Sequence, residues 1–113
     1  MRARLPTHLA VAALLRRVND AGGLAMVRAR GDADDGTILL LTFEKSRFSG
    51  IFLRERNLDG RTALVRIGPA DDVEAEAIEA YWQRRRQADP DLWVVELDVA
   101  AAERFAAETI LLD

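Results

Sequence analysis

The chain has 113 residues, of which half are hydrophobic and 31% are charged, with a formal net charge of −3 and no cysteine. This size and balance are typical of a folded domain. The lack of cysteine excludes disulfides, zinc–thiolate sites and cysteine nucleophiles. Because the longest apolar run, Leu9–Leu15, is far too short to span a bilayer, we expect a single cytoplasmic domain over residues 1–113 with no membrane partner.

The first two-thirds of the chain predict one helix and four strands. Apolar residues at i, i+3, i+4 and i+7 (Val11, Leu14, Leu15 and Val18) indicate a helix with Thr7 as N-cap, which ends at the Gly22-Gly23 pair. Strands are predicted over Leu24–Arg30, Thr37–Phe43, Ile51–Arg56 and Ala63–Ile67. We read Gly31–Gly36 as a hairpin loop and Lys45–Gly50 as a second connection. Since every connection is short, the four strands are expected to form an antiparallel meander.

The last third predicts a helix, a strand and a short helix. Asp71 is the expected N-cap of the first of these, with Glu74 as its capping-box partner, and Asp89-Pro90 ends it. A fifth strand is predicted over Leu92–Leu97 and a short helix over Ala100–Glu108, which leaves Ile110–Leu112 as an apolar tail.

These elements predict an α+β fold of order α-β-β-β-β-α-β-α. About five mostly antiparallel strands would form the sheet, the two longer helices would lie on its faces, and a short helix would end the chain. A three-layer α/β sandwich is the main alternative.

Catalytic and metal-binding patterns are scarce. His8 is the only histidine, and Ser46 and Ser49 are the only two serines, so no hydrolytic triad is recognisable. The loop aspartates Asp32, Asp34 and Asp35 do not continue as a calcium loop. We therefore expect no catalytic triad, no metal and no cofactor.

Two carboxylates stand out near aromatic residues, in the segment Asp89–Glu96. Glu96 shares a strand face with Leu92 and Val94, so partial desolvation could raise its pKa and suit it, or Asp91, to acid–base chemistry. The alternative, which we favour, is that Glu96 pairs with an arginine such as Arg28 or Arg30.

Arginine accounts for 15 of the 16 basic residues, and the charge is unevenly distributed. Residues 1–66 have a net charge of +5 and residues 67–113 a net charge of −8. Five arginines alternate along predicted strands and could share one sheet face: Arg28, Arg30, Arg54, Arg56 and Arg66. That face could bind phosphate or nucleic acid, but it lacks a stacking platform, because Phe52 is the only aromatic residue in those strands. A solvated face is favoured, and a nucleic-acid partner is not expected.

The second predicted helix carries two aromatic residues. Ile78 and Tyr81 centre its apolar face, whereas Trp82 lies toward the margin. A tryptophan in that position either edges the core or anchors an interface.

The whole chain resembles a family of short alphaproteobacterial proteins known as domain of unknown function 1491. Three stretches carry the resemblance: Leu14–Arg17, Val27–Asp32, and Arg84–Arg86 followed by the unusual Asp89-Pro-Asp-Leu-Trp-Val-Val-Glu96 string. The resemblance implies a bacterial protein and offers no activity or site to carry over.

Three functions remain open. The first is a non-enzymatic binding or interaction module that could self-associate, through Trp82 and the Ile110–Leu112 tail, as a homo-oligomer. The second is a nucleic-acid or phosphate-ligand binder that uses the strand arginines. The third is a small enzyme that uses Asp91 or Glu96, and it ranks last because so few catalytic residue types are present.

Overall fold

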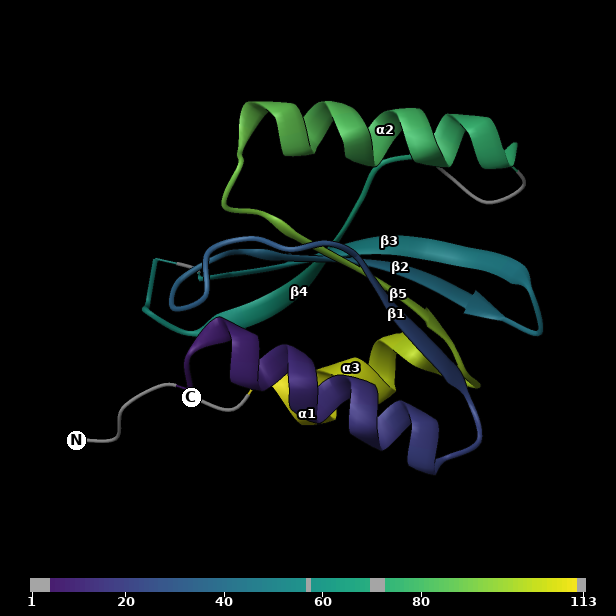
Figure 1. Cartoon of the computed structure of the whole chain (residues 1–113), viewed down its shortest axis with the longest axis horizontal. Helices are drawn as coiled ribbons and strands as arrows, with labels where there is room; N and C mark the ends of the chain where they lie inside the picture. The colour runs from purple at the N-terminus through teal and green to yellow at the C-terminus, as the bar shows by residue number, and fades with distance from the viewer. Residues whose placement is uncertain (1–4, 57, 70–72, 112–113) are drawn as a thin grey trace.

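The computed structural model describes residues 5–56, 58–69 and 73–111. In this part the chain forms three helices and one five-stranded mixed sheet, in the expected order (Figure 1). The elements are α1 Thr7–Asp20, β1 Leu24–Ala29, β2 Ile38–Glu44, β3 Arg47–Arg56, β4 Thr62–Ile67, α2 Ala75–Ala88, β5 Trp93–Asp98 and α3 Ala102–Ile110. The predicted α+β class is confirmed.

The strand order is β1-β5-β2-β3-β4, so the predicted four-strand meander is wrong at its first step. β5 lies between β1 and β2, antiparallel to β1 and parallel to β2. The loop from Gly31 to Gly36 therefore crosses the start of β5 and is no hairpin. A Cβ on either glycine would collide with the carbonyl oxygen of Asp91, which explains why glycine stands at both crossing points.

Helices cover both faces of the sheet. α1 and α3 lie together against one face and α2 lies alone against the other (Figure 1). β2 is central and buried on both faces, as its apolar sequence predicts. Side chains toward α1 and α3 form one core cluster, which includes Leu14, Phe52 and Trp93. Those toward α2 form a second, which includes Leu53 and Leu92.

A tight hairpin replaces the predicted connection over Lys45–Gly50. β3 begins at Arg47, so two residues, Lys45 and Ser46, join it to β2 with positive φ values of 51° and 68°. The Asp98 carboxylate accepts hydrogen bonds from both of their backbone N–H groups, each at 2.8 Å. A carboxylate from the neighbouring strand thus compensates for left-handed backbone that side chains disfavour.

The helix ends differ from those predicted. α1 begins at Thr7 with Pro6 in the N-cap position, and it buries Val11, Leu14 and Val18 as the periodicity predicts. α2 begins at Ala75 with Glu74 in the N-cap position, and the predicted N-cap, Asp71, lies outside the described residues. α3 extends to Ile110 and buries this first residue of the predicted tail.

Trp93→Ala should destabilise the protein by about 3–5 kcal/mol. The Trp93 side chain is 1% exposed, and its indole N–H donates to the Asp32 carbonyl at 2.7 Å, which ties the crossing loop to β5. Trp93→Phe keeps most of the ring volume but loses this bond, and should cost about 1–3 kcal/mol. Chemical denaturation measures both. A Trp93→Ala variant as stable as the parent would refute this structural role.

Candidate functional site

β1 has a β-bulge at Arg28. Val27 pairs with Val95 of β5 and Ala29 pairs with Val94, so Arg28 is the extra residue between them. Ala25 and Val27 pack on the α1 and α3 side, whereas Arg28 and Ala29 both lie on the α2 side, so the bulge interrupts the alternation of side chains after Arg28.

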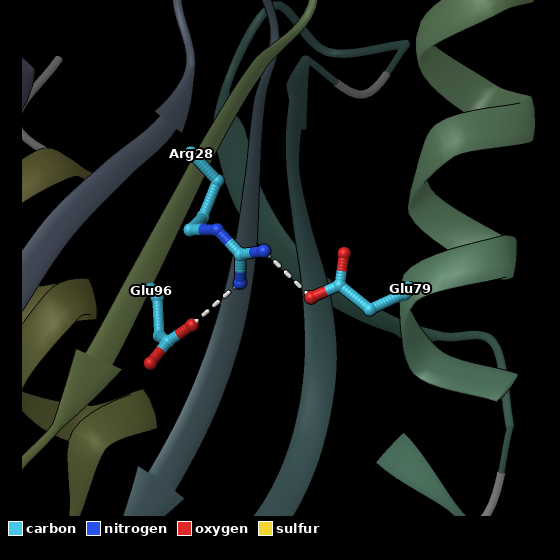
Figure 2. A network of polar contacts seen from close by, with 3 residues as sticks. All are labelled: Arg28, Glu79 and Glu96. Atoms are coloured by element: carbon cyan, nitrogen blue, oxygen red, sulfur yellow. Dashed lines mark hydrogen bonds and ion pairs between the residues drawn. The ribbon is translucent and has the colours of Figure 1, made fainter. Parts of the chain in front are cut away.

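Arg28 joins β1, β5 and α2 through two ion pairs (Figure 2). Its Nη1 donates to Glu96 Oε1 at 2.8 Å and its Nη2 to Glu79 Oε1 at 2.6 Å. Its guanidinium also lies over the Trp82 ring, 5.4 Å from the centroid. The hydrogen bond that Arg28 donates to Glu79 is the largest influence on the pKa of Arg28, and it raises that pKa despite the opposing effect of burial. A raised pKa means that this stabilisation is fully present throughout the physiological pH range.

Glu96 and Asp91 do not form an acid–base pair. Glu96 is engaged by Arg28, which is the ion pair favoured from the sequence. Asp91 is exposed just before β5, five residues earlier in the chain, which corresponds to roughly 16 Å along an extended strand. The structure therefore does not bring the two carboxylates together.

The five strand arginines do not all share one face. Arg28 points toward α2, whereas Arg54 is buried on the opposite side and donates from Nη1 to the carbonyl oxygen of Ile110 at 3.1 Å. Arg30 and Arg66 also lie on that opposite side, Arg30 at 5.0 Å from the Trp93 ring centroid and Arg66 at 5.8 Å from that of Phe52. Arg56 is exposed at the end of β3. Because Arg28 is on the other face and Arg54 is buried, the five arginines do not form one continuous surface.

α2 packs on the sheet through a small apolar contact. In the described chain its buried side chains are Ile78 and Trp82, which are 5% and 8% exposed, while Tyr81 is half-buried. The helix is thus turned so that Trp82, predicted to be marginal, faces the core. The Trp82 Nε1 and Arg86 Nε atoms are buried without a hydrogen-bond partner in the described residues. Of the features that suggested self-association, Trp82 and the first tail residue Ile110 are buried, Leu111 is half-buried, and Leu112 lies outside the described residues.

A groove lies on the flank of α2 away from Arg28. Its volume is about 440 Å³, and we call it the α2 groove. It is lined by Thr37, Leu53, Glu55, Tyr81, Arg84, Arg85, Ala88, Asp89 and Leu92. Sequence reasoning did not select this set, because its residues come from four separate parts of the chain. One sequence pattern could have indicated part of the groove. Helical spacing places four of its residues on one side of α2, namely Tyr81, Arg84, Arg85 and Ala88.

The α2 groove has an apolar floor and charged walls. Leu53 and Leu92 are buried beneath it. Arg85 donates from Nη1 to the Tyr81 hydroxyl at 3.3 Å and lies 5.8 Å from the Tyr81 ring centroid, so its position is defined. Arg84 on α2 and Glu55 on β3 are both exposed, and no ion pair joins them in the described part of the chain.

The described residues form neither a metal-ligand cluster nor a membrane-spanning helix. No group of three or more His, Asp or Glu side chains is placed to hold a metal ion within residues 5–56, 58–69 and 73–111. None of the helices found in these ranges is long and apolar enough to cross a membrane.

Comparisons with known proteins agree on one family. The family model described as "Protein of unknown function (DUF1491)" matches residues 5–107. A crystal structure of a DUF1491 family protein from Caulobacter crescentus is similar, with a TM-score of 0.77 and 29% identity over 89% of this chain and 94% of that one. An NMR structure of a DUF1491 family protein from Caulobacter crescentus has a TM-score of 0.78 and 28% identity over 92% and 94%. The solution structure of a protein from A. tumefaciens has a TM-score of 0.69 and 29% identity over 96% and 93%. No curated protein matches the sequence.

Arg28→Met should destabilise the protein by about 1–3 kcal/mol, because the apolar stem is kept while both glutamates lose their partner. Glu79→Gln and Glu96→Gln should each destabilise the protein less than Arg28→Met, because each removes one of the two ion pairs. The three side chains are about a quarter to a third exposed, so solvent weakens each pair. In double-mutant cycles by chemical denaturation, Arg28 should show coupling to each glutamate. Coupling energies of zero would contradict the network as the link between α2 and the sheet.

Proposed function

We propose that this chain, which belongs to the DUF1491 family of proteins of unknown function, is a non-enzymatic binding module whose ligand site is the α2 groove. The observation that supports this is the groove itself: about 440 Å³ of space over an apolar floor, with charged side chains on its walls. Sites for small ligands have this size and this combination of apolar surface with a few polar groups.

The side chains of the groove offer two kinds of interaction to a ligand, apolar and ionic. Leu53, Leu92 and the Tyr81 ring offer apolar surface, whose burial favours association with any apolar ligand. Arg84 and Arg85 offer guanidinium groups, which recognise carboxylates, sulfonates and phosphates. The described lining has no histidine, cysteine, lysine or serine, and its carboxylates, Glu55 and Asp89, have no such side chain beside them in the groove to activate. Binding without chemistry is the function that fits this set.

The other functions suggested by the sequence receive less support. The nucleic-acid alternative requires a continuous arginine face, whereas Arg28 lies on the α2 side of the sheet and Arg54 is buried on the other. The enzyme alternative uses Glu96 or Asp91; Arg28 engages Glu96, and Asp91 is exposed and does not line the groove. For self-association, the exposed Leu24 and Met26 on the edge strand β1 are favourable, but the bulge at Arg28 interrupts that edge.

Filling the groove tests the proposal. Ala88 is an exposed groove residue at the end of α2, so Ala88→Trp should occlude the site without removing core volume. The probe is anilinonaphthalene sulfonate, an apolar anion, titrated by calorimetry. The parent should show one saturable site, and Ala88→Trp should weaken it about tenfold or more, since a lost 1.4 kcal/mol is a factor of ten.

Ala80→Trp is the matched control. Ala80 is exposed on the same helix and lies outside the groove, so this variant should bind the probe as the parent does. Equal binding by the parent and Ala88→Trp, or no saturable site in the parent, would contradict the proposal.

A further inference from the structure

We infer that the α2 groove takes a short apolar peptide with both termini free, so that its carboxylate meets Arg84 and Arg85 while its ammonium meets Glu55. This inference rests on the proposed function and specifies its ligand class. The relevant feature is that charged side chains of both signs line the groove, on β3 and on α2, and no ion pair joins them in the described residues.

The basic side of the groove comes from one turn of α2. Arg85 is half-buried and held against Tyr81, with a hydrogen bond to the Tyr81 hydroxyl and its guanidinium over the ring. Arg84 is exposed beside it, with no ion pair in the described residues. A guanidinium whose orientation is already defined loses less entropy on binding, and guanidiniums bind carboxylates through paired hydrogen bonds. This side therefore favours a carboxylate.

The acidic side comes from the sheet, where Glu55 projects from β3 and is exposed. Asp89 also lines the groove, but it follows the last residue of α2 and so lies on the helix side, one turn beyond Arg85. Asp89 is already in use, because its Oδ1 accepts a hydrogen bond from the Asp91 N–H at 3.1 Å, so Glu55 is the available carboxylate. This side favours an ammonium group.

The apolar floor and the gap between the charges define the rest of the ligand. Glu55 lies close enough to line one groove with Arg84 and Arg85, yet no ion pair joins them in the described chain. A ligand with one charge would pair either with Glu55 or with the arginines, and the other charged group would remain without a partner from the ligand. A dipeptide places charges at both ends of an apolar body, and its side chains can cover Leu53 and Leu92. A bound dipeptide would thus pair with the charged side chains of both walls and cover the apolar side chains of the floor.

The test uses the dipeptide phenylalanyl-leucine, its N-acetylated form and its C-terminal amide, each titrated into the parent by calorimetry. The free dipeptide should bind at one site, and each blocked form should bind about tenfold more weakly, as expected when one charge-assisted hydrogen bond is lost. Glu55→Gln should abolish the difference between the free and the acetylated forms. Arg84→Gln and Arg85→Gln should reduce the difference between the free acid and the amide.

Two controls and the contrary outcomes complete the test. Glu76→Gln and Arg16→Gln alter exposed charges outside the groove and should leave all three affinities unchanged. Equal binding of free and blocked dipeptides, or no binding of any of them, would overturn this inference. If the sulfonate probe still binds the parent and not Ala88→Trp in that case, the groove remains a binding site for another ligand, so the two proposals fail separately.

Discussion

The docking of α2 onto the sheet is the interaction on which the candidate site depends. One wall of the groove is made of α2 residues, so the groove exists only while the helix stays in place. The apolar contribution is small, because in the described chain Ile78 and Trp82 are the side chains that α2 buries. The buried Trp82 Nε1 and Arg86 Nε, unpaired in the described chain, oppose docking by about 1–3 kcal/mol each. The ion pairs of Arg28 therefore contribute more to holding α2 on the sheet than the partial exposure of this side chain suggests.

The strand order explains how one arginine can hold the helix. Because β5 lies between β1 and β2, Glu96 is placed beside the β1 bulge and under α2. Arg28 lies on the same side of the sheet, where Glu79 approaches from the helix. A simple meander would have separated Glu96 from β1. The ion pairs on one flank of α2 and the groove on its other flank are thus consequences of the same topology.

Much of the fold follows from local patterns in the sequence, and the site does not. Periodicity locates α1 and the buried strand β2, because apolar spacing reflects burial directly. The position of β5 cannot be deduced from short connections, since it depends on Gly31 and Gly36 making room for a crossing loop. The pairing of Glu96 with Arg28 was among the sequence alternatives, but the groove unites Leu53, Glu55 and Arg85 through tertiary packing. No spacing rule brings such distant residues together.

The most direct measurement is native-state hydrogen exchange on the parent and on Arg28→Met. If α2 is held as described, its amides should exchange through a local opening that costs less free energy than the opening of β2 and β5. Arg28→Met should lower the opening free energies of α2 and of the two strands by a similar amount, about 1–3 kcal/mol, because it destabilises the native state relative to both open states, and α2 should still open first. Exchange of α2 amides only through global unfolding in the parent, or an unchanged opening free energy of α2 in Arg28→Met, would contradict the account.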